Sequence, residues 1–110
     1  MNLKIQLVKT KKEYKDILEI RKKVFVEEQN VPLNIEIEHE EDSKHVICFI
    51  DQLAVGTGRW RKTKNGIKLE RFAVLTDFRN KGIGKEIVNF ILSEISSNNT
   101  IYLHAQEAVV

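Results

Sequence analysis

The most informative part of the sequence reads Leu69-Glu70-Arg71-Phe72-Ala73-Val74-Leu75, followed by a short loop and then Arg79-Asn80-Lys81-Gly82-Ile83-Gly84. Its first half has the composition of a strand, and its second half is a glycine-containing loop that opens a helix. Backbone N–H groups at a helix N-terminus are unpaired and carry the positive end of the helix dipole, so they hold anions. Gly82 and Gly84 allow a pyrophosphate to approach the backbone, while Arg79 and Lys81 add positive charge. The stretch therefore predicts an anion site, although it has neither the dinucleotide fingerprint nor the P-loop pattern.

Around this stretch, hydrophobic periodicity divides the chain into strands and helices. We expect strands over residues 3–8, 45–50, 53–62, 67–75 and 101–106, and helices over residues 10–26 and 81–97. Thr10 and Glu13 have the spacing of a capping box. Asp51-Gln52 and Asn65-Gly66 are expected hairpin turns, and both residues of the second pair tolerate a positive φ angle. The order of strand, helix, three antiparallel strands, helix and strand indicates an α/β fold of the α+β type.

Composition limits the classes of function. The 110 residues fit one domain, and contents of 42% hydrophobic and 31% charged residues are those of a globular protein. Eighteen basic against sixteen acidic residues, with no basic tract, argue against nucleic-acid binding. No apolar run approaches the ~18 residues of a membrane span and no signal-peptide pattern is present, so we expect no membrane contact and a cytoplasmic location. The histidines lack ligand spacing, so no metal is expected, and a buried inert thiol is favoured for Cys48 over a reactive one.

The pattern R-x-x-G-x-G at residues 79–84, after a strand ending in Ala73-Val74, resembles the acetyl-CoA-binding motif of the GNAT superfamily of N-acetyltransferases. Further blocks resemble the YjcF/ElaA-like branch of that superfamily, in the same order along the chain: residues 20–32, 56–61, 69–71 and 103–106. The resemblance covers nearly the whole chain. It implies one N-acetyltransferase domain over residues 1–110, with a GNAT-like mixed, mainly antiparallel sheet flanked by helices.

The resemblance also implies how the cosubstrate acetyl-CoA is bound. The pantetheine arm is expected along the exposed backbone of Phe72, Ala73 and Val74, like an added strand. One of these N–H groups would bind the thioester carbonyl and stabilise the oxyanion. Their side chains can pack in the core at the same time, because only the backbone binds. The pyrophosphate is expected at the loop and helix start: Arg79, Asn80, Lys81, Gly82, Ile83, Gly84 and Lys85.

Glu70 is the candidate general base, because acetyl transfer requires that the amine lose a proton. Alternation along a strand would place Glu70 on the same face as Phe72 and Val74. Strands disfavour glutamate, so a specific role is expected. The alternative is an ion pair that stabilises the sheet, with Arg59, Arg61 or Arg71 as partner.

The acceptor is expected to be a primary amine on a small molecule or a peptide. The family places the acceptor pocket at the end of the first helix, where Glu27, Glu28 and Gln29 occur. Acidic side chains there would attract a cationic amine. A solvated acidic helix end explains them nearly as well.

GNAT chains usually continue with about another helix and two strands, which supply a tyrosine that protonates the CoA thiolate. This sequence stops at Val110, and neither Tyr14 nor Tyr102 matches that motif. If these 110 residues are the whole molecule, the strand at residues 101–106 forms an open edge, and we expect self-association there, with a homodimer among the products, or aggregation. If they are part of a longer chain, we expect the continuation to supply the covering strands and the tyrosine. Three functions compete: an N-acetyltransferase, a non-catalytic acyl-CoA-binding module of the same fold, and a structural protein without a ligand.

Overall fold

The computed structural model describes residues 2–30, 40, 42–95 and 99–103. In chain order the elements are β1 (Leu3–Leu7), α1 (Lys11–Arg21), the π-helical η1 (Lys22–Glu28), β2 (Ser43–Ile50), β3 (Leu53–Thr63), β4 (Gly66–Val74), the 3₁₀ turn η2 (Thr76–Phe78), α3 (Ile83–Glu94) and β5 (Ile101–Leu103). The predicted succession of strands and helices is confirmed. Residues 96–97 of the expected last helix and 104–106 of the expected last strand lie outside the described residues.

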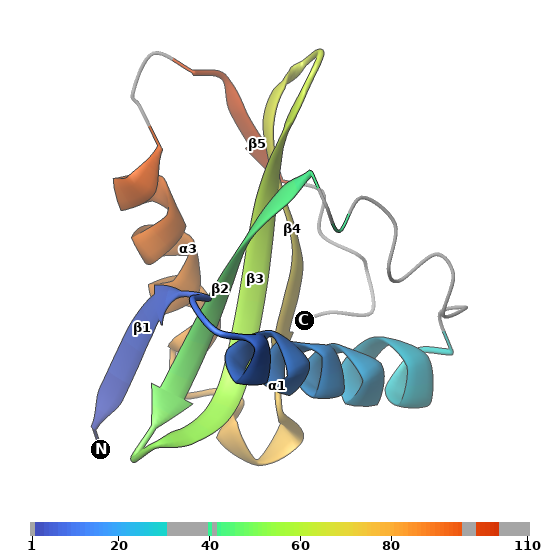
Figure 1. Ribbon diagram of the computed structural model, residues 1–110, viewed down its shortest axis with the longest axis vertical. Helices are drawn as coiled ribbons and strands as arrows, with labels where there is room; N and C mark the ends of the chain where they lie inside the picture. Colours follow the sequence, from blue (N-terminus) through green and yellow to red (C-terminus); the bar gives the residue numbers. More distant parts are fainter. Residues whose placement is uncertain (1, 31–39, 41, 96–98, 104–110) are drawn as a thin grey trace.

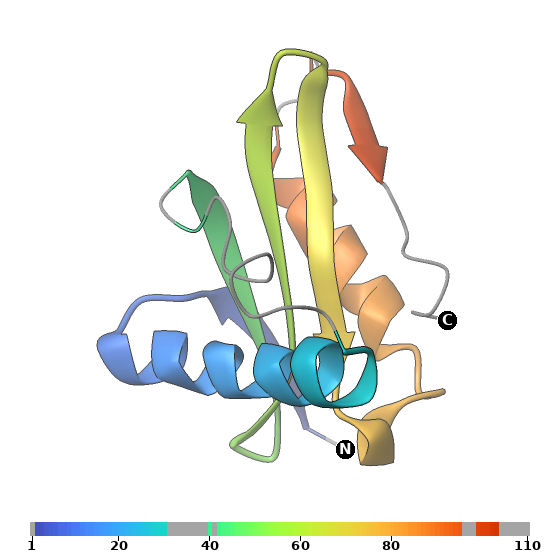
Figure 2. The same ribbon diagram turned by 90° about the vertical axis from the view of Figure 1, so that its right-hand side faces the viewer.

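The five strands form one sheet in the order β1-β2-β3-β4-β5. Neighbouring strands from β1 to β4 are antiparallel, whereas β5 runs parallel to β4. Figures 1 and 2 show α1 with η1 on one side of β3 and β4, and α3 on the other side. The expected architecture, a mixed and mainly antiparallel sheet flanked by helices, is confirmed.

Each face of the sheet carries its own hydrophobic cluster. The larger cluster, which we call the α3-side cluster, joins α3 to the strands through Ile83, Ile87 and Ile91. The smaller one, the α1-side cluster, joins α1 and η1 to β4 and includes Phe25 and Ala73. Because both faces are covered, β2 and β3 contain runs of consecutive buried residues instead of a strict alternation.

The first helix begins where the capping pattern predicts. Thr10 Oγ1 accepts a hydrogen bond from the Glu13 N–H (3.1 Å), and Glu13 Oε1 accepts one from the Lys9 N–H (2.8 Å). These bonds satisfy donors that a helix start leaves unpaired. Helical structure continues to Glu28, two residues past the expected end, with π-helical turns from Lys22.

Both expected hairpin turns are present, but the second is displaced by one residue. Asp51-Gln52 connects β2 to β3 with positive φ angles of 49° and 73°. Lys64 and Asn65 form the turn between β3 and β4, so Gly66 is already the first residue of β4. Of the expected turn pair Asn65-Gly66, only Gly66 has a positive φ (131°), and a Cβ there would clash with the Thr100 carbonyl oxygen. The close approach of the chain before β5 therefore requires this glycine.

A β-bulge interrupts β4 at Arg71. Thr57 of β3 pairs with Ala73 and Arg59 pairs with Glu70, so one residue of β3 lies opposite two residues of β4. Arg71 takes up the extra length with a φ of 57°. A bulge of this kind moves every following side chain to the opposite face of the sheet.

The expected common face of Glu70, Phe72 and Val74 is wrong because of this bulge. Phe72 and Val74 pack against the α3-side cluster, whereas Ala73 belongs to the α1-side cluster. Glu70 also lies on the α1 side, where it contacts Arg59. The candidate base and the Phe72 side chain therefore occupy opposite faces of β4.

Candidate functional site

The N-terminus of α3 is open and presents backbone donors. Asn80 and Gly82 have positive φ angles (63° and 78°), and α3 begins only at Ile83. The first helical bond runs from the Glu86 N–H to the Gly82 carbonyl (3.1 Å), so the preceding N–H groups lack helical partners. In the described chain no side chain caps this helix, and a Cβ built at Gly82 or Gly84 would meet no atom within 4 Å. The space beside these donors is therefore open to an anionic group such as a pyrophosphate.

The charged residues around this helix start differ in their surroundings. Lys81 and Lys85 are exposed. Arg79 is half-buried, and its Nε donates to the Val74 carbonyl at the end of β4 (2.8 Å). The loop thus combines two exposed cations with one arginine fixed to the strand.

The end of β4 presents backbone groups at an edge of the sheet. Pairing with β5 ends at Leu69 and Leu103, and no other described strand lies beside residues 72–74 on that side. The Leu75 N–H donates to the Val55 carbonyl of β3 (2.9 Å), so the polar groups of Val74 point away from β3. This orientation is compatible with the predicted binding of a pantetheine arm.

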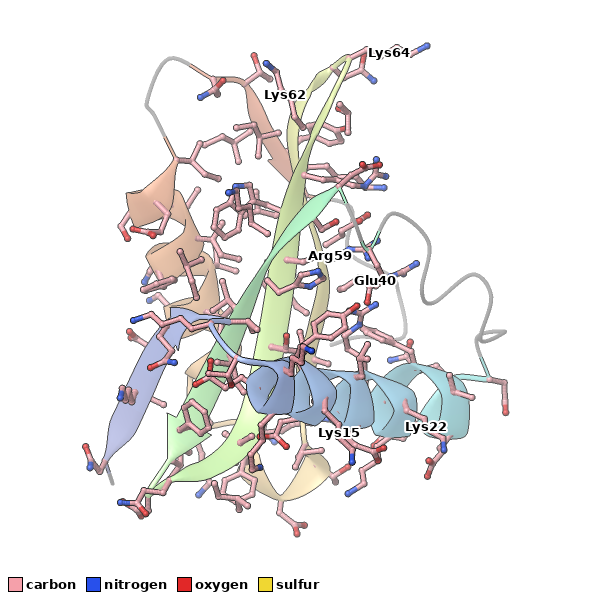
Figure 3. The ribbon with its side chains drawn as sticks, viewed as in Figure 1. Lys15, Lys22, Glu40, Arg59, Lys62 and Lys64 are labelled. Atoms are coloured by element: carbon pink, nitrogen blue, oxygen red, sulfur yellow. The ribbon has the colours of Figure 1, made fainter. Side chains whose placement is uncertain are left out.

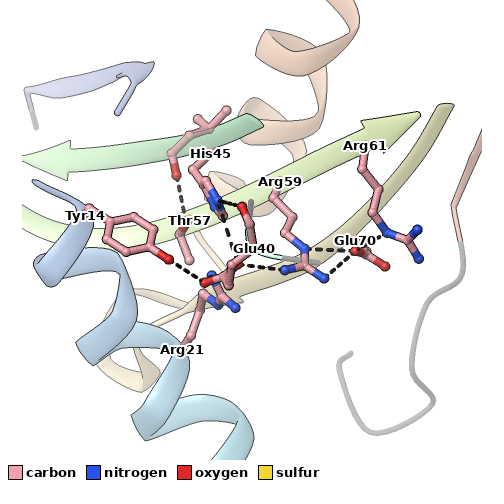
Figure 4. A network of polar contacts seen from close by, with 9 residues as sticks. Tyr14, Arg21, Glu40, His45, Thr57, Arg59, Arg61 and Glu70 are labelled. Atoms are coloured by element: carbon pink, nitrogen blue, oxygen red, sulfur yellow. Dashed lines mark hydrogen bonds and ion pairs between the residues drawn. The ribbon is translucent and has the colours of Figure 1, made fainter. Parts of the chain in front are cut away.

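Glu70 is 8% exposed and lies among cations (Figure 4). The Nε atoms of Arg59 (2.8 Å) and Arg61 (2.9 Å) donate to its Oε2, and Lys68 Nζ lies 3.3 Å from its Oε1. Burial alone raises the pKa of Glu70, but the hydrogen bond from Arg61 and the charge of Arg59 outweigh burial and lower the pKa to about 2. The ion-pair alternative therefore describes the observed contacts, with Arg59 and Arg61 as partners. Arg71 instead lies over the Phe25 ring, 5.8 Å from its centroid.

Glu40 extends these contacts to α1, although no sequence motif marks it. Its Oε1 accepts from Arg21 Nη1 (2.7 Å) and Tyr14 Oη (2.9 Å), and its Oε2 accepts from Arg59 Nη1 (2.7 Å). Figure 3 shows Glu40 and Arg59 close together near the middle of the molecule. The available signal was Arg21, which occupies an apolar position of the helical repeat and is fully buried. A buried arginine needs a carboxylate partner, but the sequence does not say which one.

The three predicted acceptor-side residues lie at the end of η1 in different surroundings. Glu28 Oε2 accepts from Arg79 Nη2 (2.8 Å), and Glu28 Oε1 accepts from the Thr76 hydroxyl (2.8 Å). These hydrogen bonds, that from Arg79 above all, lower the pKa of Glu28. Glu27 is exposed and Gln29 is half-buried. The structure therefore joins Glu28 to the loop with the predicted phosphate site.

Three further expectations concern the cysteine, metal binding and membrane spans. Cys48 is fully buried in the α3-side cluster, and burial raises the pKa of its thiol to about 11, so the thiol is protonated and inert. Over residues 2–30, 40, 42–95 and 99–103, no three His, Cys, Asp or Glu side chains are grouped to hold a metal ion. In that same part of the chain, the helices are too short or too polar to cross a bilayer.

Comparison with known families matches residues 8–110 to the acetyltransferase (GNAT) domain. The chain is 40% identical over 83 residues to the uncharacterized N-acetyltransferase YjcF of Bacillus subtilis (strain 168). The aligned stretch covers 74% of this chain and 59% of that protein. The chain therefore spans about three fifths of the length of the curated relatives that it matches.

Solved structures share the fold. Escherichia coli ElaA superposes with a TM-score of 0.82 at 20% identity, covering 98% of this chain and 81% of that one. An acyl-CoA N-acyltransferase from Pseudomonas aeruginosa gives a TM-score of 0.84 at 21% identity, covering 98% and 82%. At these identities the likeness establishes the arrangement of strands and helices.

Proposed function

Because the chain belongs to the GNAT family of acetyltransferases, we propose that it transfers the acetyl group of acetyl-CoA to a primary amine on a small molecule or a peptide. The observation that carries this proposal is the open N-terminus of α3, where Gly82 and Gly84 leave room beside unpaired N–H groups. Acetyl-CoA supplies an acetyl group as a thioester, which an amine can attack directly. The residues of this chain have to hold both substrates and receive one proton.

Two parts of the chain would hold acetyl-CoA. The N–H groups of residues 81–85 would bind the pyrophosphate, and the exposed Lys81 and Lys85 would add positive charge. The loop residues Arg79 and Asn80 would shape this site, Asn80 through its positive φ. The backbone of residues 72–74 would bind the pantetheine arm, since the N–H of Val74 points away from β3, whereas its carbonyl accepts from Arg79.

Glu70 is the proposed acceptor of the amine proton, directly or through water. Glu70 lies on the α1 side of β4, the same side as η1. The proposed acceptor-side residues are Glu27, which belongs to η1, and Gln29, which directly follows η1. With a pKa of about 2, Glu70 is ionised at neutral pH but is a weak base. We therefore expect its contribution to the rate to lie near the low end for general bases, about 10²-fold.

Two measurements test this function. Calorimetric titration with CoA measures cofactor binding, and release of free thiol from acetyl-CoA measures turnover. The amine panel contains a polyamine, an aminosugar, an aminoglycoside and a lysine peptide. We expect CoA binding, and thiol release that depends on the amine supplied. A folded protein that binds no CoA would refute the proposal.

A non-catalytic acyl-CoA-binding module is the second candidate. The observation that favours it is the set of three cations around Glu70, which makes this carboxylate a poor base. CoA binding without thiol release for every amine of the panel would identify this function.

A further inference from the structure

The ion pair between Glu28 and Arg79 connects two parts of the chain that are 51 residues apart in sequence. Arg79 Nη2 lies 2.8 Å from Glu28 Oε2 and 3.3 Å from Glu28 Oε1. Thr76 holds the same carboxylate from η2, and Arg79 Nε is bonded to the Val74 carbonyl. The last residue of η1, the end of β4 and the loop before α3 therefore meet at one guanidinium group.

The contacts of Arg79 use only part of its hydrogen-bonding capacity. A guanidinium has five N–H donors in a rigid planar fork. The recorded bonds go from Nε to Val74 and from Nη2 to Glu28. Within the described chain the two Nη1 hydrogens have no recorded protein acceptor. A guanidinium held in this way is ready to donate to a phosphate.

Glu28, by contrast, has both carboxylate oxygens engaged. Oε2 accepts from Arg79, and Oε1 accepts from Thr76 and Arg79. Glu27, the preceding residue, is exposed, and the structure records no bond from its carboxylate to another described residue. Of the two adjacent glutamates, Glu27 is therefore the one that is free to attract a cationic amine.

We propose that Glu28 is a positioning residue for CoA: it holds Arg79 in the orientation in which the guanidinium meets the pyrophosphate. The inference rests on the proposed function, because it requires that this loop bind CoA. It reassigns Glu28 from recognition of the acceptor to preorganisation of the cofactor site. Glu27 and Gln29 keep their proposed place on the acceptor side.

For CoA affinity, the orientation that Glu28 gives to Arg79 outweighs the partial neutralisation of the Arg79 charge by Glu28. The two side chains are 35% and 37% exposed, so water and salt screen the repulsion between Glu28 and a phosphate. A free arginine side chain loses conformational entropy when a ligand immobilises it. In the folded protein Arg79 is already held by Glu28 and Val74, and Thr76 holds Glu28, so CoA binding requires less of this loss. Losing Glu28 should therefore weaken CoA binding by about three- to tenfold.

A double-mutant cycle on CoA affinity tests the proposal. Calorimetry on the full chain, with CoA and without any amine, would compare the parent, Glu28→Ala, Arg79→Ala and the double variant. We expect Glu28→Ala to raise the Kd of CoA by about three- to tenfold. The double variant should bind like Arg79→Ala, because Glu28 acts through that arginine. Glu27→Ala is the matched control, and its Kd for CoA should equal that of the parent.

Each outcome decides the proposal. The proposal is overturned if the Kd of CoA for Glu28→Ala equals or falls below that of the parent. It is also overturned if the fold-changes in Kd of the two single variants multiply in the double variant. Glu28→Gln, which keeps the shape of the side chain and removes its charge, should lie between the parent and Glu28→Ala. If the parent itself binds no CoA, the proposed function fails, and the inference fails with it. Melting temperatures of all variants would show that each one is folded.

Discussion

The surroundings of Glu70 determine its chemistry more than its place in a strand does. The hydrogen bonds and charges of Arg61 and Arg59 outweigh burial and keep the carboxylate ionised, so it accepts a proton only weakly. We expect Glu70→Gln to lower kcat by about 10²-fold and to leave the affinity for acetyl-CoA nearly unchanged. Steady-state thiol release and a CoA titration measure the two quantities. If Glu70→Gln keeps the kcat of the parent but melts at a lower temperature, Glu70 is not the base, and its role is to stabilise the sheet through its ion pairs.

The same carboxylate predicts how the free energy of unfolding depends on pH. The pKa of Glu70 is about 2 in the folded protein against an ordinary value of 4.5. Between these pH values the unfolded chain binds more protons. The stabilisation by Glu70 is therefore complete above about pH 4.5 and is lost as the pH falls toward 2. It amounts to on the order of 3 kcal/mol.

We expect the difference in unfolding free energy between the parent and Glu70→Gln to shrink across that interval. Urea unfolding at several pH values between 7 and about 3 measures this difference. Glu28 and Glu40 also have lowered pKa values, but they are present in both proteins, so their effects cancel. A difference that does not change with pH would contradict the ion-pair account of Glu70.

At the level of the elements, α3 and the loop before it offer a direct test of the proposed phosphate site. Gly82 has a φ of 78°, so any side chain there strains the backbone. An effect of such a substitution on CoA affinity could then not be separated from an effect on stability. Gly84 lies in the first turn of α3 without a positive φ, and a Cβ there meets no atom within 4 Å. We expect Gly84→Val to keep a melting temperature close to the parent's, since valine is no worse than glycine in a helix.

The same Gly84→Val variant should weaken CoA binding by more than about tenfold, because its side chain fills the space beside the helix N–H groups. Calorimetry measures the affinity, and thermal unfolding measures the fold. A folded Gly84→Val that binds CoA like the parent would remove the basis for the phosphate site.

Elements with strong local signals could be predicted from the sequence, and features that depend on a distant partner could not. The capping pair Thr10 and Glu13 fixed the start of α1, because both groups of the cap lie within four residues. The bulge at Arg71 has no such signal. It depends on β3, where Gly58 makes room for the Phe72 ring: a Cβ at Gly58 would lie 2.9 Å from that ring.

In the candidate site, too, the features set by neighbouring residues could be predicted from the sequence, and the contacts between distant residues could not. The motif at residues 79–84 marked the helix N-terminus, since glycines and cations adjacent in sequence define it. The bond between Glu28 and Arg79 joins residues 51 positions apart, and that between Glu40 and Arg59 joins residues 19 apart. Periodicity assigns a side chain to a face, but it does not choose among several carboxylates the one that an arginine meets.

For the molecule as a whole, Glu40 connects α1 to the centre of the sheet. Arg21 of α1 and Arg59 of β3 both donate to Glu40, and each side chain is 1% exposed. Removing one partner of a buried ion pair costs about 3–5 kcal/mol, because the remaining charge loses its compensation. Arg59 keeps Glu70 as a partner, so we expect Glu40→Gln to cost near the lower end, about 3 kcal/mol.

That loss should lower the melting temperature by more than about 10 °C in a chain of this size. Lys12→Ala is the control, since it removes another ion pair, Lys12–Asp16, whose lysine is 82% exposed. An exposed pair contributes at most about 1 kcal/mol, so this variant should melt within a few degrees of the parent. If Glu40→Gln and Lys12→Ala shift the melting temperature equally, the contacts of Glu40 do not hold α1 to the sheet. A large shift for Glu40→Gln alone would mean that attachment of α1 and η1 to the sheet depends on this one carboxylate as well as on the α1-side cluster.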